Sequence, residues 1–397
     1  MQKIPPEVLS NIFQFFISSD SDSEPNPYSP LILGTICGRW RAITWSTPRL
    51  WSSISINFGT GSKLQLAQEW LSRSGQLPLS ISMTAGIDRD LLPLLSALID
   101  VINGYAHRWR VLDILLPPPM LPLFHADPRG ISILHTLRID PGILFSEARR
   151  VSENFNPTNP CPSPIVVGIF SVHFKSVRIR WGNVTHLDVE YFSIDECFEV
   201  LRQAPSLTNC RFDSIKSNQH DFPLPESILY HPNLTSLSIC CQDPAIFFQY
   251  ISFPYLIFLS LGGDFTRFPT QDFLSFLRRS SPPLHELHLL SFEGEDEESI
   301  FQILNGTPSL KIFRLYPCMD NEYNPSRLFQ RLSDSPSTFS NNGAEFLPHL
   351  ETMSYRGLLN FPWDLIPKIF GPTWRPLSNF DLDCYGLFQE DPKGSLH

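Results

Sequence analysis

Cysteine and histidine side chains are the usual protein ligands of zinc, so pairs of them were considered first as sites of chemistry. Cys240 and Cys241 are adjacent, with His231 upstream of them, and His285 and His288 form a second pair. Both pairs lie in segments with the apolar pattern of strands. Residues one or three apart on a strand point to opposite faces, so neither pair predicts a metal site. For the histidines we expect a solvated strand edge.

Acidic residues cluster at Glu293 and again from 295 to 298. Carboxylates in the first turn of a helix are stabilised by the helix dipole, so a helix N-terminus or a solvated loop would explain this composition. A docking patch for a basic partner is the alternative interpretation.

The sequence has none of the common catalytic motifs. It contains no Gly-rich phosphate loop, no Gly-x-Ser-x-Gly turn, no His-Glu-x-x-His and no Cys-x-x-Cys. We therefore expect a protein that is not an enzyme, with no catalytic residue, no metal and no cofactor. An enzyme whose site is not recognisable from sequence is the alternative.

Charge and composition exclude several classes of protein. The 30 Lys and Arg residues are outnumbered by 40 Asp and Glu residues, whereas a general nucleic-acid-binding surface has a basic excess. No apolar run is long enough for a membrane span, and the N-terminus lacks the features of a signal peptide. Eight cysteines without framework spacing are typical of a reducing compartment. We expect an intracellular protein, cytoplasmic and/or nuclear, that binds neither nucleic acid nor membrane.

The first 57 residues have the pattern of short helices. Pro5 and Pro6 suit the start of a helix, and apolar residues recur with helical spacing over 8–16. An acidic, proline-containing stretch at 18–30 predicts a loop, and a second, strongly apolar helix is expected from there to Thr47. We expect three short helices in all. So small a unit cannot bury all its large apolar side chains, which then face a partner or pack onto the rest of the chain.

Two segments of this region, IPPEVLSNIF at 4–13 and LGTICGRWRAITWSTPRLWSSI at 33–54, resemble an F-box motif. The motif opens with Leu-Pro-x-Glu and two apolar residues, has a Cys-x-Lys/Arg-Trp/Phe core and ends near a Leu-Trp pair. Here Ile4 replaces the leucine, and Cys37 begins the core. The insertion at 18–30 departs from the pattern, although similar insertions occur in the F-box-like domains of many fungal proteins.

The resemblance implies a three-helix domain that binds the Skp-family adaptor of a Skp–cullin–F-box (SCF) ubiquitin ligase, and through it a cullin. It implies binding by apolar anchors, without chemistry on this chain. The adaptor-binding positions carried over from the family are Ile4, Pro5, Val8, Leu9, Ile12, Phe13, Ile36, Cys37 and Trp40.

An apolar-x-x-apolar-x-apolar pattern recurs ten times after residue 105. Seven of the nine offsets between its starts lie in the 20–29-residue range of leucine-rich repeats, and another, 50 residues, is twice 25. Short amphipathic helices and turns separate several copies, so the region resembles leucine-rich repeats with a parallel strand in each unit. The copies begin at Trp109, Leu134, Val184, Leu207, Leu234, Leu256, Leu284, Leu310, Leu350 and Leu377.

We therefore predict an α/β fold, in which a small N-terminal helical F-box is followed by an irregular leucine-rich-repeat solenoid with a parallel sheet on its concave side. The predicted boundaries are 1–57 for the F-box-like domain, 58–105 for a linker or capping region and 106–390 for the solenoid. Within the linker, the pattern predicts a helix over 64–71, a strand over 79–83 and a helix over 91–102.

In such a solenoid the ligand-binding face is the concave side of the sheet. It is formed by the residues that alternate with the inward apolar ones, and here we expect it to bind an unknown target protein. The residues assigned to it are His186, Asp188, Glu190, Phe258, Glu286, His288, Arg314 and Tyr316.

Together these resemblances imply the substrate-recognition subunit of an SCF-type ubiquitin ligase. The F-box would bind the adaptor, and the repeats would bind the target. The alternative is a non-catalytic leucine-rich-repeat scaffold that no longer binds the adaptor.

Overall fold

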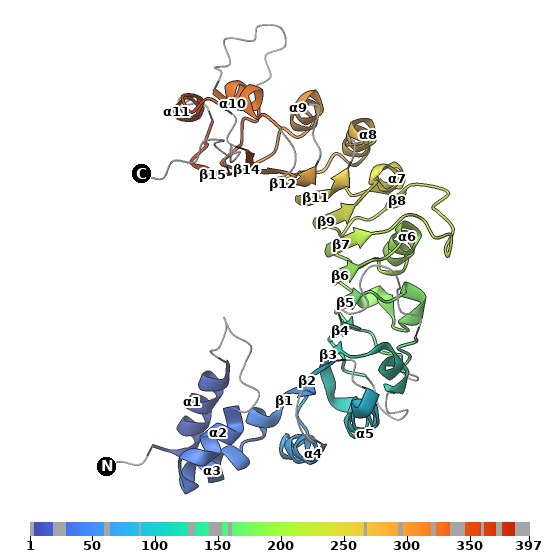
Figure 1. Cartoon of the computed structure of the whole chain (residues 1–397), viewed down its shortest axis with the longest axis vertical. Coiled ribbons are helices and arrows are strands. Elements are labelled where there is room, and N and C mark those ends of the chain that lie inside the picture. The colour runs from blue at the N-terminus through green and yellow to red at the C-terminus, as the bar shows by residue number, and fades with distance from the viewer. Residues whose placement is uncertain are drawn as a thin grey trace, which may run out of the picture. The chain divides into compact units, whose positions relative to one another are not determined.

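The fold is α/β, and a parallel sheet contains thirteen of the fifteen described strands. The chain divides into two compact units, Met1–Tyr191 and Phe192–His397, which are described separately (Figure 1). No described helix is both long and apolar enough to cross a lipid bilayer. The computed structural model describes residues 4–18, 29–58, 64–86, 89–125, 132–142, 153–157, 161–265, 268–292, 297–318, 323–333, 346–358, 361–370 and 375–385.

The first unit begins with three helices, α1 (Pro6–Ser18), α2 (Ser29–Ile36) and α3 (Gly38–Trp45), and the 3-10 turn η1 (Pro48–Trp51). The prediction of one continuous helix after the loop is wrong, because the chain breaks at Cys37. Its backbone is extended, with φ −160° and ψ 165°. The Cys37 sulfur accepts a hydrogen bond from the Trp40 N–H at 3.5 Å and so caps α3.

Six strands follow in the first unit, ordered β1-β2-β3-β4-β5-β6 and paired in parallel. The sequence pattern did not predict β1 or β5 as separate strands. β5 lies between the copies that begin at Leu134 and Val184, which are 50 residues apart, about two repeat lengths. The strands are β1 (Ser53–Phe58), β2 (Leu79–Ala85), β3 (Trp109–Leu115), β4 (Thr136–Asp140), β5 (Val166–Phe170) and β6 (His186–Glu190).

The two helices expected between residues 58 and 105 are present as α4 (Leu64–Arg73) and α5 (Leu92–Asn103). The described parts of the later connections contain 3-10 turns instead of α-helices, in part because prolines at 117, 118, 119 and 122 prevent a regular helix there. The turns are η2 (Arg89–Leu91), η3 (Ala106–Arg108), η4 (Pro118–Leu123), η6 (Phe174–Ser176) and η7 (Trp181–Asn183).

The second unit has seven strands of the main sheet, ordered β7-β9-β11-β12-β13-β14-β15, and a separate parallel pair, β8 (Leu229–Tyr230) with β10 (Ile251–Ser252). The main strands are β7 (Asn209–Ile215), β9 (Ser236–Cys241), β11 (Phe258–Phe265), β12 (Glu286–Phe292), β13 (Ile312–Pro317), β14 (Thr352–Leu358) and β15 (Asn379–Tyr385). The helices are α6 (Ile194–Gln203), α7 (Ala245–Tyr250), α8 (Thr270–Ser280), α9 (Glu297–Asn305), α10 (Ser326–Ser333) and α11 (Leu365–Ile369), and in Figure 1 they lie along one face of the sheet.

One backbone arrangement repeats from strand to strand in the second unit. The carbonyl of Thr235, just before β9, accepts hydrogen bonds from the N–H groups of Ile257 (2.8 Å) and Phe258 (3.0 Å). The carbonyl of Ile257 then accepts from His285 and Glu286, and the series continues along the sheet. Each strand therefore starts at the same height as its neighbour, and this fixes the register.

The repeated apolar pattern is confirmed as strand core. All ten copies lie on strands or just before them, and the central positions of the first nine, such as Leu287 and Phe313, are buried. The many phenylalanines fill the space between sheet and helices. In α7 and α8, for example, Phe248 lies 5.1 Å from Phe273 and 5.6 Å from Phe276, measured between ring centroids.

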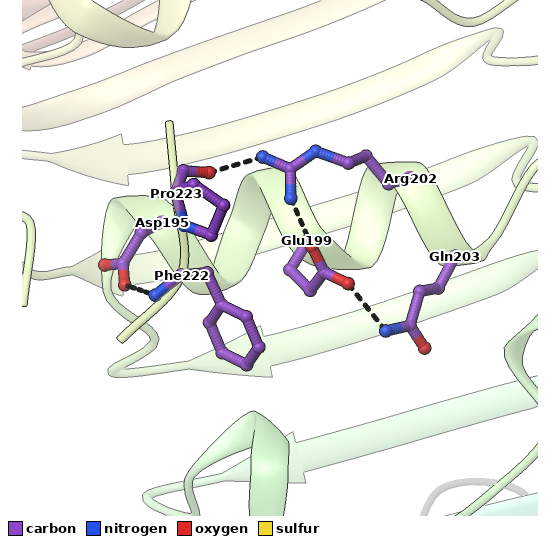
Figure 2. A network of polar contacts seen from close by, with 6 residues as sticks. All are labelled: Asp195, Glu199, Arg202, Gln203, Phe222 and Pro223. Atoms are coloured by element: carbon purple, nitrogen blue, oxygen red, sulfur yellow. Dashed lines mark hydrogen bonds and ion pairs between the residues drawn. The ribbon is translucent and has the colours of Figure 1, made fainter. Parts of the chain in front are cut away.

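Helix α6 shows how polar groups hold the connecting loops (Figure 2). The Asp195 carboxylate, fully buried, accepts hydrogen bonds from the N–H groups of Gln219 (3.1 Å) and Phe222 (3.0 Å). Burial raises the pKa of Asp195, but these bonds outweigh it, so the pKa lies below its usual value. Arg202 donates to the Pro223 carbonyl and pairs with Glu199. These hydrogen bonds thus join the loop after β7 to α6, the helix that precedes β7.

Candidate protein-binding surfaces

Helix α1 has two apolar faces, and only one of them is buried. Leu9 and Phe13 belong to the core, and the Phe13 ring packs against Trp40 with centroids 4.7 Å apart. Val8 and Ile12, each one residue earlier, are exposed. Successive residues on a helix are about 100° apart, so the two pairs point in different directions. The helix therefore presents apolar side chains to solvent as well as to the core.

The exposed apolar side chains continue onto α2, which packs against α1. Seven large side chains in this region have exposed fractions between 42% and 76%, and we call them the apolar stripe. Exposed apolar surface of this kind on a folded unit is typical of a protein interface. The apolar stripe consists of Ile4, Val8, Ile12, Phe15, Phe16, Ile32 and Ile36.

Tryptophan side chains pack between the three-helix region and the segment that contains the first strand. The Trp51 indole N–H donates a hydrogen bond to the Thr44 carbonyl at 2.8 Å, and its ring meets those of Trp45 (5.4 Å) and Trp70 (4.8 Å) nearly edge-on. The Arg73 guanidinium lies over Trp45 at 4.9 Å, a favourable cation–π distance. These contacts join α3 and η1 to α4, and the Phe13–Trp40 contact joins α1 to α3.

The predicted adaptor-binding residues divide into two groups. Leu9 and Phe13 are buried, and Trp40 is half-buried against Phe13. The other six are exposed: Ile4, Pro5, Val8, Ile12, Ile36 and Cys37. The predicted adaptor-binding set did not include Phe15, Phe16 and Ile32, which are exposed. The signal for Phe15 was available, since residues 8, 12 and 15 follow helical spacing on one face.

In the second unit, neighbouring strands place five predicted target-binding residues side by side on the open face of the sheet. Phe258 is in register with Glu286, and His288 is in register with Arg314. Tyr316 follows two residues later on β13, a strand whose side chains alternate between half-buried and buried. These are the residues Phe258, Glu286, His288, Arg314 and Tyr316, which we call the β11–β13 cluster.

Within this cluster, two side chains converge on Glu286. The His288 Nε2 lies 2.7 Å from the Glu286 Oε1, and the Arg314 Nη2 lies 3.8 Å from the same oxygen. Burial lowers the pKa of His288, while the hydrogen bond and charge of Glu286 oppose the shift. With its pKa below the usual value, His288 is neutral at neutral pH, and its Nε2–H donates to Glu286.

The same cluster offers both apolar and cationic contacts. Phe258 meets His288 edge-on, with centroids 4.9 Å apart. The Arg314 Nε is buried and, among the described residues, has no hydrogen-bond partner. Ser260 is in register with His288, but no hydrogen bond joins them, so the nucleophile–base contact of acyl-transfer chemistry is missing. A surface of this composition can bind a polypeptide.

A second ion pair borders the cluster. The Arg356 Nε on β14 lies 2.7 Å from an Asp383 oxygen on β15, and the Arg356 guanidinium lies 5.3 Å from the centre of the Tyr316 ring. Neither Arg356 nor Asp383 was among the predicted residues. Their role depends on which strands are neighbours, and the sequence pattern alone does not specify side-chain contacts across strands.

The other three predicted target-binding residues, His186, Asp188 and Glu190, lie on β6 of the first unit. They are in register with Val166, Gly168 and Phe170 of β5. Sequence reasoning combined them with the β11–β13 cluster into one face, whereas the structure divides the eight residues between the two units.

Next to β5, an arginine stacks on an aromatic ring. The Arg138 guanidinium lies 4.5 Å from the centre of the Phe170 ring, and its Nε is 3.9 Å from Asp113. Burial raises the pKa of Asp113, and the charge of Arg138 opposes this. A Cβ on Gly168 would lie 3.1 Å from the Phe170 ring and 3.4 Å from Arg138, so a larger residue there would require the stacked side chains to shift slightly.

The cysteines and acidic residues singled out from sequence occupy ordinary structural positions. Cys241 is buried, with its pKa raised to about 12 mainly by burial, while Cys240 is half-buried on the opposite face. All eight cysteines carry free thiols. Glu297 and Glu298 lie in the first turn of α9, in agreement with the helix-terminus interpretation, and 293–296 lie outside the described residues.

Comparison with known proteins identifies no relative. No protein-family model matches the sequence, and no curated protein matches it.

Proposed function

We propose that the chain is the substrate-recognition subunit of an SCF-type ubiquitin ligase. Residues 1–57 would form an F-box that binds the Skp-family adaptor and through it a cullin. The strand-and-turn units that follow would form a leucine-rich-repeat solenoid that binds the target. The chain itself would need no cofactor and carry out no chemistry. An intracellular location, cytoplasmic and/or nuclear, follows from these partners.

The apolar stripe carries this proposal. Four of its seven residues, Ile4, Val8, Ile12 and Ile36, fall in the two segments that resemble the F-box pattern, and the other three adjoin those segments. The Phe13–Trp40 contact joins α1, which carries most of the stripe, to α3. Large apolar anchors are the usual source of affinity at a protein interface. An adaptor that offers an apolar groove would cover them.

The repeated geometry of the sheet supports the second half of the proposal. Parallel strands with a common starting height, each preceded by a short helix or turn, are typical of leucine-rich repeats. Such arrays bind proteins through side chains on the open face of the sheet. The β11–β13 cluster, which mixes a phenylalanine, a tyrosine, an arginine and a Glu–His pair, fits a protein target.

The test is co-expression with a Skp-family adaptor, followed by size-exclusion chromatography of the wild type and two variants. Ile12→Asp places a carboxylate in the apolar stripe at a side chain that is 47% exposed, so the core is untouched. Ile133→Asp is the matched control, the same change at a side chain that is 44% exposed outside the stripe. We expect co-elution for the wild type and Ile133→Asp, and its loss for Ile12→Asp, because an unpaired charge is costly in an apolar contact.

Thermal unfolding of the three proteins without adaptor should give the same midpoint, which separates lost binding from lost folding. If all three co-elute with the adaptor, the apolar stripe is not the contact surface. If none does, although all are folded, the ligase proposal fails. The repeat scaffold that has lost adaptor binding would then be the better description.

A further inference from the structure

β15 is the last strand of the sheet, and one of its two edges has no neighbour among the described residues, which we call the free edge. All seven of its residues pair with β14, from Asn379 opposite Thr352 to Tyr385 opposite Leu358. No other described strand pairs with it. An exposed strand edge presents backbone N–H and C=O groups in a row, and these can hydrogen-bond to a further strand.

The apolar side chains of β15 are incompletely covered. Phe380 and Leu382 are in register with Met353 and Tyr355 of β14, which are fully buried, yet they themselves are only half-buried. The equivalent residues of β13, Phe313 and Leu315, have no exposed surface. The side chains of a further strand beside β15 would cover part of the apolar surface that these two residues leave exposed.

Two exposed aromatic residues flank α11 at the same end of the unit. Phe370 is 46% exposed, and its ring centroid lies 6.2 Å from that of Phe380. Trp363 is 57% exposed and lies 5.7 Å from Phe361, which packs with Phe380 around Phe329. The helix-covered side of the β15 edge is therefore apolar and aromatic.

The open side of the β15 edge is acidic. Asn379, Asp381 and Asp383 alternate with the apolar residues and are exposed. Asp383 pairs with Arg356, whereas Asp381 has no hydrogen bond or ion pair in the described part of the chain. Side chains of neighbouring strands lie beside one another on each face, so an added strand would need cations on one face and apolar groups on the other.

We propose that the free edge of β15 binds an extended segment of a partner protein in which lysine or arginine alternates with apolar residues. Backbone hydrogen bonds to the edge supply affinity, as in other cases of strand addition. The basic residues lie beside Asp381 and Asp383. The apolar residues cover Phe380 and Leu382. This surface uses none of the residues of the apolar stripe or the β11–β13 cluster, although the Arg356–Asp383 ion pair borders that cluster. The inference does not depend on the proposed ligase function.

A second copy of this chain is a poorer occupant. A two-fold axis pairs identical strands antiparallel, and an axis at Leu382 would place Asp381 of each copy opposite Asp383 of the other. An axis at either aspartate would place that residue opposite itself. Like charges directly opposite each other on adjacent strands are destabilising.

Residues 386–397 of the same chain are also a poor occupant. They lack the alternation of basic and apolar residues that the edge requires, since their one cation is Lys393.

The test uses the full chain and a labelled peptide of β15 length, Lys-Val-Lys-Val-Lys-Val-Lys, measured by fluorescence anisotropy at low salt. One comparison peptide has Glu in place of Lys, and another has alternate backbone nitrogens methylated. We expect the first peptide to bind and the other two not to bind. If the methylated peptide binds equally well, strand pairing is excluded and the proposal is wrong.

Charge variants locate the site. Asp381→Lys should weaken binding about tenfold, since it replaces a cross-strand attraction by a repulsion. The matched control is Asp100→Lys, the same change at an exposed residue of α5 in the other unit, which should leave the affinity unchanged. Equal weakening by both variants would show only general attraction of a cationic peptide to an acidic protein and would overturn the proposal.

Two further measurements test the rival occupants. If a chain ending at Tyr385 binds the peptide and the full chain does not, the tail itself occupies the edge, and the proposal is wrong. If sedimentation shows that the full chain dimerises and that Asp381→Lys changes the dimer, a second copy is the occupant, and the proposal is again wrong. Peptide binding by a monomeric full chain supports it.

Discussion

The first and last strands of the sheet differ in how their apolar side chains are covered. In β1, exposed and buried residues alternate, and Ile54, Ile56 and Phe58 are all buried. In β15, Phe380 and Leu382 are only half-buried. Each strand pairs with one described neighbour, β2 or β14. The difference therefore lies in the groups that pack over the strand, not in the pairing.

The cover of β1 is specific and rich in tryptophan. The Trp70 indole N–H donates to the Ser53 carbonyl at 3.0 Å, and Trp51 packs edge-on against Trp70. A stacked array must end in a unit that covers the last apolar face. Trp51 of η1 and Trp70 of α4 supply such a cover for β1, while β15 has the ring cluster around Phe329 and an exposed Phe370. We call the β1 end, where the apolar side chains are all buried, the closed end, and the β15 end, where they are partly exposed, the open end.

The largest expected effect is loss of the closed end. Trp51→Ala removes a side chain that is 1% exposed, together with its hydrogen bond to Thr44 and its contacts with Trp45 and Trp70. A buried Trp→Ala change leaves a large cavity, so the free energy of unfolding should fall by about 3–5 kcal/mol. Urea unfolding followed by circular dichroism measures it.

Trp363→Ala is the control at the open end, where the side chain is mostly exposed. It should destabilise the protein by less than about 1 kcal/mol, as is usual for surface positions. Equal losses for the two tryptophan variants would remove the distinction between a closed and an open end.

The strand pattern could be predicted because one face of the sheet is buried under helices and turns. That burial imposes the apolar alternation that sequence periodicity detects, as at Leu284, Leu287 and Leu289. The break at Cys37 was missed because apolar spacing continues across it, and only the extended backbone of that residue ends α2 and allows α3 to start.

The surfaces were harder to predict than the core. Leu9 and Phe13 differ from Val8 and Ile12 only in the direction each points, and α1 is apolar on both sides. Which face is covered depends on Trp40, a residue distant in sequence. Likewise the Glu286–His288–Arg314 contacts require the register of two strands, which no single-strand pattern contains. The half-buried state of Leu382 reflects the incomplete cover of β15 and has no local signal in the sequence.

A matched pair of strand variants sharpens the comparison. Ile56→Ala removes a buried side chain from β1 and should lower the free energy of unfolding by about 3 kcal/mol. Leu382→Ala, at a half-buried position in β15, should lower it by about 1 kcal/mol, because part of the apolar surface is exposed already. Denaturant midpoints with unchanged slopes provide the measurement. Addition of the alternating Lys–Val peptide should stabilise the wild type more than Leu382→Ala.

The smallest expected effect is a pH dependence that arises at neither end. His231 is buried in the second unit, and its Nε2–H donates to the Ala204 carbonyl at 3.0 Å. Its Nδ1 is buried without a hydrogen-bond partner in the described residues, and burial lowers the pKa of His231 from 6.5. Above that pH, His231 is neutral in both states and its contribution is complete.

As the pH falls through 6.5, the unfolded chain binds a proton that the folded chain resists, so the free energy of unfolding falls until the pH passes the lowered folded pKa. Each unit by which the folded pKa is lowered corresponds to about 1.4 kcal/mol. Trp51→Ala and Leu382→Ala should shift the stability–pH curve without changing its slope. His231→Gln, which keeps a donor for Ala204, should flatten it. If the slope persists in His231→Gln, other groups cause the acid sensitivity. His288, whose pKa is also lowered, would then be the next residue to substitute.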